Sequence, residues 1–131
     1  DTIEDSGGRD VIMGDFGFYD TWNTSRYPKV LVTINCSLGG RDTLYGGDGD
    51  VDYLVGGSLD DVVHADENSS NNSANMDIVF GDHAEILFYE DVSHQLQQAI
   101  TIDVDCNGGS DVITLGPGDD WVSVRFGQRL Y

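Results

Sequence analysis

The chain contains few of the residues on which several classes of protein depend. Its 131 residues include 6 Lys and Arg against 24 Asp and Glu, which gives a formal net charge of -18. A nucleic-acid-binding surface needs positive charge, so the composition argues against a nucleic-acid partner. No run of about 18 apolar residues occurs, and we expect no membrane-spanning segment. The chain has 2 prolines but 17 glycines, a balance that favours tight turns between short strands.

Catalytic motifs are also missing. The three histidines, His64, His83 and His94, lack the H-E-x-x-H or any similar spacing, so zinc hydrolysis has no support. The sequence contains no nucleophile elbow, Ser-His-Asp arrangement or phosphate-binding loop. The paired carboxylates Asp60-Asp61 and Asp119-Asp120 lie beside turn glycines, which favours turn or cation chemistry over a glycosidase pair. We therefore expect that the chain is not an enzyme.

A glycine-aspartate phrase followed by a short apolar segment recurs along the chain. It is most complete between Gly46 and His64, as GGDGDVDYLV and GGSLDDVVH, and shorter copies begin at Gly7, Gly39, Gly108 and Gly116. Each copy combines a tight turn with a short strand. Stacked copies would place aspartates of neighbouring turns side by side. Their charges would repel one another unless cations neutralised them.

A longer duplication is also present. DVIMGDFGFYD at Asp10–Asp20 pairs with DIVFGDHAEILFYED at Asp77–Asp91, and Val32–Asp50 pairs with Ile100–Asp120, at offsets of 67 to 69 residues. We therefore expect a single domain over 1–131 that is built from two units of one design. The units are residues 10–76 and 77–131, with 1–9 completing a coil.

Each unit contains a segment without glycine turns. In the second unit it runs out on 84–89 and returns on 99–105, where Ile100 and Ile102 alternate with polar residues; in the first unit the return strand is 29–35. This alternation predicts half-buried strands. We interpret each segment as a β-hairpin arm that projects from the stack. The aromatic residues near the arms either pack against the rest of the fold or form a surface for sugar or a neighbouring subunit.

The repeated phrases resemble a known calcium-binding motif. GGDGDVDYL and GGSLDDVV are similar to the G-G-x-G-x-D-x-U-x nonapeptide of the RTX, or hemolysin-type, family, and DIVFGDHAEI resembles a connecting segment of long tandem RTX proteins. The resemblance covers most of the chain except the arm tips and the loop at 68–75. It implies an all-β, right-handed parallel β-roll, or β-solenoid, with two projecting hairpin arms. In that family calcium lies between the turns of successive coils.

The resemblance also implies which residues bind calcium, a cation that prefers carboxylate and carbonyl oxygens. The aspartates at the motif position are Asp10, Asp42, Asp52, Asp61, Asp77, Asp111 and Asp120. Supporting carboxylates are Asp48, Asp50, Asp60 and Asp119, and Asp15 and Asp82 are expected to close sites from the next coil. For a single aspartate the alternative is a turn residue that bonds its own backbone. The apolar residues expected to fill the core are Ile12, Leu44, Leu54, Val63, Val79, Ile113 and Val122.

Other features favour secretion. Four acceptor triplets for N-glycosylation begin at Asn23, Asn35, Asn68 and Asn71. The first residues do not form a signal peptide, which does not exclude secretion. The two cysteines, Cys36 and Cys106, fit either a disulfide or two small buried residues. Equivalent positions two coils apart would be separated by about 10 Å, whereas a disulfide needs Cα atoms within about 7 Å. Because the cysteines are one residue out of register, the pairing stays open.

The sequence thus predicts a secreted or cell-surface structural module that binds calcium. One hypothesis makes it a building block of an extracellular fibre or surface assembly through head-to-tail stacking, because a contact that does not close on itself generates a filament. Two alternatives stay open. The chain is an adhesin or glycan-binding module, or it is an accessory RTX domain of a secreted enzyme.

Overall fold

The structure, a computed structural model, describes residues 1–5, 7–21, 28–48, 51–66, 76–89, 96–102, 106, 108–123 and 129–130. Within these ranges the chain is all-β and contains no helix. Its strands form three sheets, two of them parallel and one antiparallel. The parallel pairing of strands from successive turns of the chain is consistent with a β-solenoid.

The two parallel sheets consist almost entirely of three-residue strands. The first sheet has the order β1-β5-β7-β11-β13 and the second has the order β2-β6-β8-β12. The strands of the first sheet are β1 (Thr2–Glu4), β5 (Thr43–Tyr45), β7 (Val62–His64), β11 (Val112–Thr114) and β13 (Arg129–Leu130). Those of the second are β2 (Val11–Met13), β6 (Tyr53–Val55), β8 (Ile78–Phe80) and β12 (Trp121–Ser123).

The third sheet is antiparallel and contains the segments that lack glycine turns. It has the order β10-β9-β4-β3. Its strands are β3 (Gly17–Thr21), β4 (Pro28–Thr33), β9 (Ala84–Phe88) and β10 (Leu96–Thr101). β3 pairs with β4 and β9 pairs with β10, and β4 also pairs with β9. The two antiparallel pairs of the two units therefore form one continuous sheet.

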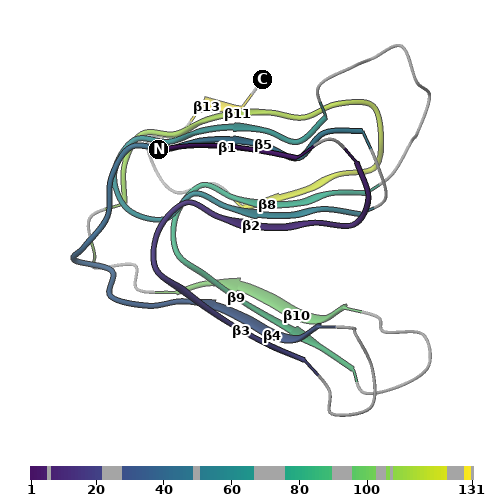
Figure 1. The fold of residues 1–131 in the computed structure, drawn as a ribbon, viewed down its shortest axis with the longest axis horizontal. Helices are drawn as coiled ribbons and strands as arrows, with labels where there is room; N and C mark the ends of the chain where they lie inside the picture. The colour runs from purple at the N-terminus through teal and green to yellow at the C-terminus, as the bar shows by residue number, and fades with distance from the viewer. Residues whose placement is uncertain are drawn as a thin grey trace.

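The three sheets lie in layers, with the second sheet between the first and the third (Figure 1). Between the first and second sheets the central residues of β2, β5, β6, β7, β8 and β11 are buried in one cluster, which contains Ile12, Leu44, Leu54, Val63, Val79 and Ile113 together with Ala65. Val122 packs against this cluster and is partly buried. The core residues expected from the repeat are therefore confirmed, because a three-residue strand can direct only its middle side chain inward when its ends turn outward.

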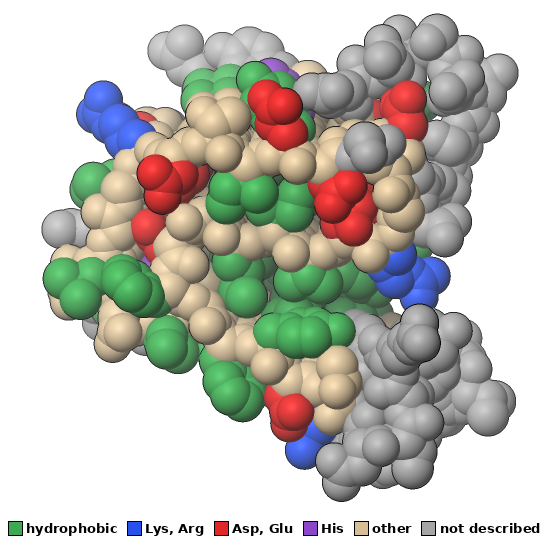
Figure 2. Space-filling model, in the orientation of Figure 1, with side chains coloured by type: hydrophobic (Ala, Val, Ile, Leu, Met, Phe, Trp, Pro, Cys, Tyr) green, Lys and Arg blue, Asp and Glu red, His purple; other side chains and the backbone are tan. Residues whose placement is uncertain are grey.

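A second cluster joins the third sheet to the second. Leu31, Ile86 and Phe88 pack there against the outward residues of β6 and β8, and the rings of Tyr53 and Phe88 meet edge to face with centroids 5.1 Å apart. Figure 2 shows hydrophobic side chains gathered at the centre of the view, where the second and third sheets meet. Of the aromatic residues near these segments, Phe88 is buried in this cluster, whereas Tyr19 and Tyr89 are exposed. Trp22 and Tyr27 lie outside the described residues, so the two roles that the sequence left open both remain.

Some predicted boundaries differ from the structure. β10 begins at Leu96, three residues before the predicted return strand, because the pairing with β9 continues through a bulge between Leu96 and Gln98. The end of that predicted strand, at 103–105, lies outside the described residues. No helix that is long and apolar enough to cross a membrane occurs in the described part of the chain.

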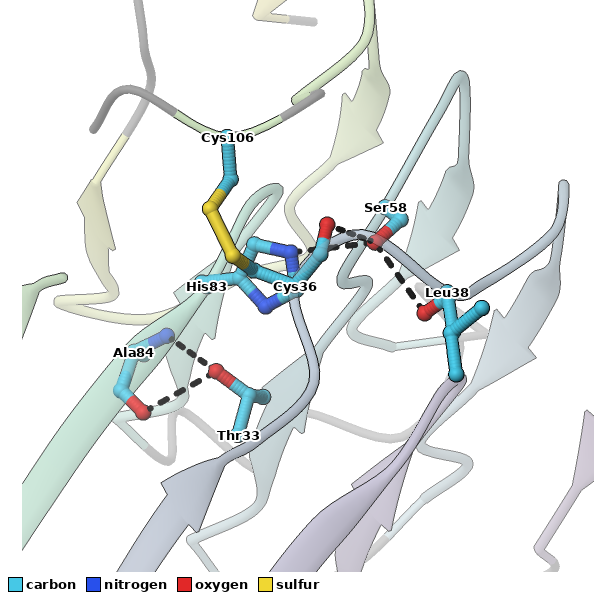
Figure 3. The surroundings of a disulfide bond; sticks show 7 residues. All are labelled: Thr33, Cys36, Leu38, Ser58, His83, Ala84 and Cys106. Atoms are coloured by element: carbon cyan, nitrogen blue, oxygen red, sulfur yellow. Dashed lines mark hydrogen bonds between the residues drawn. A yellow bond between two sulfur atoms is a disulfide. The ribbon is translucent and has the colours of Figure 1, made fainter. Parts of the chain in front are cut away.

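Cys36 and Cys106 form a disulfide, with their Cα atoms 5.7 Å apart. Both cysteines follow the return strands of the third sheet, where the chain has left the regular stack, so the spacing between coils does not separate them. Beside the disulfide, the buried side chains of Ser58 and His83 lie 3.1 Å apart between Oγ and Nε2, and Ser58 Oγ also donates to the Cys36 carbonyl (Figure 3). The bond therefore joins the two units at a packed, hydrogen-bonded site.

Candidate metal centre

The aspartates that precede the strands of the first sheet form a column, which we call the first ladder: Asp42, Asp61 and Asp111. Asp42 N–H donates to Asp61 Oδ1 at 2.8 Å, and Asp61 N–H donates to Asp111 Oδ1 at 2.8 Å. The nitrogen of Asp1, just before β1, donates to Asp42 Oδ1 at 2.7 Å. Each coil therefore gives its backbone N–H to the carboxylate of the next, which holds the turns in register.

A second ladder precedes the strands of the second sheet and contains Asp10, Asp52, Asp77 and Asp120. Its members repeat the same bond from coil to coil, with N to Oδ1 distances of 2.9, 3.0 and 3.1 Å. The seven aspartates at the motif position thus divide into two columns, one for each parallel sheet. The sequence predicted all seven as one set, and the structure separates them into two.

Both ladders leave carboxylate oxygens buried without a partner. The side chains of Asp42, Asp52, Asp61 and Asp77 are each less than 5 % exposed. Among the described residues, no hydrogen-bond partner is found for Oδ2 of Asp10, Asp42, Asp61, Asp66 and Asp77. A buried ionised oxygen without a partner is costly. These atoms therefore call for a proton or a cation.

Turn glycines and carbonyl oxygens surround these unpartnered atoms. A Cβ atom at Gly14 would lie 2.6 Å from Asp42 Oδ2 and 2.6 Å from the Gly56 carbonyl oxygen. A Cβ atom at Gly56 would lie 2.6 Å from Asp61 Oδ2 and would also contact the Gly81 carbonyl oxygen. Only glycine fits there, because any side chain would occupy the space between the carboxylate of one coil and the carbonyl of the next.

The second ladder has a similar cradle. A Cβ atom at Gly46 would lie 3.0 Å from Asp52 Oδ2 and 2.5 Å from the Ala65 carbonyl oxygen. The backbone beside it turns through Gly47, whose φ of 84° lies in the left-handed region that favours glycine. Each ladder therefore combines carboxylate and carbonyl oxygens within one turn, the donor types that a hard cation prefers.

The pKa values of the buried carboxyls reflect this crowding. The pKa of Asp61 is raised to about 8, chiefly by burial and also by the charges of Asp111, Asp42 and Asp15, while the hydrogen bond from the Asp42 N–H lowers it. Burial likewise raises the pKa of Asp52 to about 7 and that of Asp77 to about 6. The folded chain therefore disfavours the ionised form of these groups at neutral pH, unless positive charge lies near them.

Asp15 and Asp82 occupy the points where the antiparallel segments leave the stack. Asp15 accepts the backbone N–H of Gly40 at 2.9 Å and that of Ser58, and Asp82 accepts the N–H of Gly109 at 3.2 Å. These carboxylates thus hydrogen-bond backbone N–H groups of distant turns, 25 to 43 residues away in the sequence. Their expected role in closing metal sites from the next coil stays a prediction. Asp15 also lies close enough to Asp61 to raise its pKa.

The supporting carboxylates lie in less buried places. Asp60 Oδ2 forms an ion pair with Arg41 at 2.7 Å, and its Oδ1 accepts the N–H of Ser110 at 2.9 Å. Asp48 is partly buried and Asp119 is exposed, whereas Asp50 lies outside the described residues. The structure therefore brings Asp48 toward the second ladder. There the pKa of Asp66 is raised chiefly by burial, then by the charge of Asp120 and then by the charge of Asp48.

Sequence reasoning missed Asp66 and Asp5. Asp66 has a buried oxygen without a described partner, and the charge of Asp5 raises the pKa of Asp10 after burial. An alignment of the turns contains the missing signal, because Ala65-Asp66 follows β7 as Gly46-Gly47 follows β5. Asp66 therefore takes the place of the second glycine of the motif.

Side chains alone do not assemble a metal site in the part of the chain that the structure describes. No group of three or more His, Cys, Asp or Glu side chains is placed to hold one ion there. The oxygens available at each turn are one or two carboxylates together with backbone carbonyls. The chemistry therefore fits a hard, oxygen-seeking cation held largely by the backbone, and not a site for zinc, which prefers histidine and cysteine.

A pocket of about 470 Å³ lies at the β1 end of the first ladder. It is lined by Asp1, Gly14, Asp15, Phe16, Gly39, Gly40 and Asp42. Two of the aspartates discussed above, Asp15 and Asp42, thus face a space that reaches solvent, which would let a cation enter the end of the column.

Of the predicted glycosylation sites only Asn35 lies within the described residues. Its side chain is exposed and its φ is 57°; Asn23, Asn68 and Asn71 fall outside them.

No protein-family model, curated protein or solved structure matches this chain. Its function must therefore be argued from the ladders and the surfaces themselves.

Proposed function

We propose that this chain is an extracellular structural repeat module whose two aspartate ladders bind calcium. The observation that carries the proposal is the set of unpartnered, buried Oδ2 atoms, which lie beside carbonyl oxygens at glycine turns. In the first ladder the ligands would be Asp42 and Asp61 with the carbonyls of Gly56 and Gly81. Calcium would supply the positive charge that the buried carboxylates lack.

The second ladder would bind calcium through Asp52 and Asp77 with the carbonyl of Ala65. Asp10 and Asp120 extend the same column, and Asp66 adds a carboxylate to it. The crowding that raises the pKa of Asp52 would favour a cation between the coils, because a divalent ion interacts with several of these charges at once. Binding energy would then become folding energy, since the unfolded chain has no such site.

The proposal includes the finer form of the fold. The stacked strands would form a right-handed β-roll from which the two antiparallel pairs extend as hairpin arms, and calcium would fix the turns of the roll. The disulfide of Cys36 with Cys106 fits an oxidising, extracellular compartment. Extracellular calcium is at millimolar concentration, which suits weaker sites of this kind.

Far-UV circular dichroism in calcium and after addition of EGTA tests the proposal. We expect a large loss of β-sheet signal in EGTA at pH 8 and its full recovery on addition of calcium, with magnesium as the control ion. A spectrum and a thermal midpoint that stay the same with and without calcium would show that the ladders need no divalent ion.

A further inference from the structure

The duplication in the sequence corresponds to a repeating block of structure. The strands of the two units occupy equivalent places: β2 with β8, β3 with β9, β4 with β10, β5 with β11, β6 with β12 and β7 with β13. Each unit thus adds two strands to each of the three sheets. Because neighbouring strands are about 4.8 Å apart in any sheet, one unit advances all three sheets by about 9.6 Å. The hairpins and the coils therefore advance by the same distance per unit.

The two units already meet through all three sheets. The junctions are β7 with β11, β6 with β8, and β4 with β9. In the third sheet, Leu31 lies opposite Ile86 and Val32 lies opposite Glu85. This internal junction is an established interface between two copies of the same design.

The outermost strands of the sheets, as far as the structure describes them, repeat that junction. At one end the edge strands are β12 in the second sheet and β10 in the third; at the other end they are β2 and β3. By equivalence, the register of the internal junction would place Ala99 opposite Tyr19 and Ile100 opposite Phe18 of another copy. It would likewise place Trp121 opposite Val11.

The backbone groups at these edges are in phase. Ile102 N–H donates to the His83 carbonyl, and Ile34 N–H donates to the Phe16 carbonyl. Hydrogen-bonded pairs alternate along an antiparallel ladder. The backbone groups of Ile100 therefore face Glu85 and those of Phe18 face Val32, whereas Ala99 and Tyr19 direct their backbone groups to the outer edges of the sheet. Those two residues are the ones that the register places opposite each other.

Apolar side chains are exposed along the same edges. Phe18 is 51 % exposed, Ile100 is 38 % exposed and Trp121 is 51 % exposed. Phe18 and Ile100 stand at the two ends of one row across the third sheet, which runs through Val32 and Glu85. A second copy would bring Ile100 and Phe18 together as neighbours on one face.

We propose that a second copy of this chain docks end to end on the β10 and β12 edges through its own β3 and β2 edges, so that all three sheets continue across the contact. This inference rests on the proposed function as a structural repeat module and names the surface through which such modules would stack. Such edges are otherwise a liability that proteins cover or block. The second ladder would also continue across the contact, since Asp120 would lie next to Asp10 of the second copy.

One strand has to give way for this contact to form. β1 and β13 both occupy the place in the repeat that β7 occupies in the first unit. In the register of the first sheet, Thr2 and Arg129 are each equivalent to Val62, and Ile3 and Leu130 are each equivalent to Val63. β1 of the second copy and β13 of the first therefore require the same place beside β11. Docking replaces the two-residue β13 by the three-residue β1 of the neighbour.

The test uses sedimentation velocity of the full chain in calcium over a range of concentrations. Ala99→Pro removes a backbone N–H that the β10 edge would donate, and Tyr19→Pro does the same on the β3 edge; edge strands tolerate proline where the N–H points outward. Ala99→Ser and Tyr19→Ser are the matched controls because they keep the N–H. We expect concentration-dependent oligomers for the wild type and both serine variants, and monomers for each proline variant alone.

Mixing the two proline variants makes the test specific for an end-to-end contact. Each variant retains one intact edge, so the intact β10 edge of Tyr19→Pro can bind the intact β3 edge of Ala99→Pro. The mixture should form dimers and stop there, because the outer edges of that dimer are both blocked. A mixture that stays monomeric, or that forms chains, would overturn the proposal. Wild-type monomers at every concentration would overturn it too.

A third variant tests the exchange of strands and does not depend on the proline variants folding. Leu130→Gly weakens β13, because glycine disfavours strands, and this should raise the oligomer fraction at a given concentration; a lower fraction would contradict the exchange. Circular dichroism with and without EGTA, recorded on the same samples, separates this inference from the proposed function. A protein whose fold depends on calcium but that stays monomeric would support calcium binding and refute the docking. Oligomers whose fold is the same with and without calcium would support the docking and refute calcium binding.

Discussion

Replacement of Asp61 by Asn should stabilise the calcium-free protein at pH 8. Asp61 is 1 % exposed, and its pKa rises from 3.8 to about 8, first because of burial and then because of the charges of Asp111, Asp42 and Asp15. A pKa raised in the folded state gives stability that is present below the unfolded value and is lost as the pH rises through the folded value. At pH 8 the ionised form therefore opposes folding.

The magnitude follows from the size of the shift. One pKa unit corresponds to about 1.4 kcal/mol, so a rise of about four units penalises the folded state by about 5 kcal/mol at pH 8. Coupled carboxyls share such a penalty, and we expect the substitution to recover about 2 to 4 kcal/mol. Asparagine keeps the Oδ1 acceptor for the Asp42 N–H, and its amide group can donate toward the carbonyl oxygen of Gly81.

Urea denaturation in EGTA at pH 4 and pH 8 measures this effect. The variant should gain stability at pH 8 and little at pH 4, where Asp61 is protonated in the folded protein. Asp60→Asn is the matched control, because Asp60 is partly exposed and paired with Arg41, and it should not gain stability at pH 8. In calcium the order should reverse, since the asparagine side chain lacks the charge that would bind the ion. An Asp61→Asn variant that is less stable than the wild type at pH 8 in EGTA would refute the reasoning.

Three other predictions concern the wild type, the disulfide and a turn glycine. In EGTA the free energy of unfolding of the wild type should fall as the pH rises from about 4 to about 8, because the buried ladder carboxyls have raised pKa values, and calcium should remove this dependence; a stability that rises over that range in EGTA would contradict it. The double substitution Cys36→Ser with Cys106→Ser opens a loop with a sequence separation of 70 and should cost about 4 kcal/mol by urea denaturation, whereas an unchanged midpoint would exclude a stabilising bond. Gly56→Ala would place a Cβ 2.6 Å from Asp61 Oδ2, whereas Gly40→Ala meets nothing within 4 Å, so the first should lower both stability and the response to calcium while the second changes neither.

The repeat in the sequence was enough to predict the parallel strands and their core. The residues that follow the motif aspartates by two positions are buried in one cluster, as at Leu54 and Val63, or pack against it, as at Val122, because each short strand leaves one inward position. The antiparallel segments were also predicted as strand pairs. Their union through β4 and β9 was not, since nothing local in either hairpin indicates that the two lie side by side.

The candidate site was predicted only in part. The motif indicated Asp42 and Asp52, but the division into two ladders depends on which sheet each turn enters, and that follows from the path of the whole coil. The roles of Asp15 and Asp82 as acceptors for the following turns depend on the close return of the chain after the third sheet. Asp66 was missed because an aspartate in place of a turn glycine does not match the motif.

An anomalous difference map from a crystal grown in calcium tests the central claim most directly. The account predicts calcium peaks between successive coils, beside Oδ2 of Asp61 in one column and Oδ2 of Asp77 in the other. Ordered ladder carboxylates with no anomalous peak beside them, in a protein that stays folded at pH 8, would contradict it.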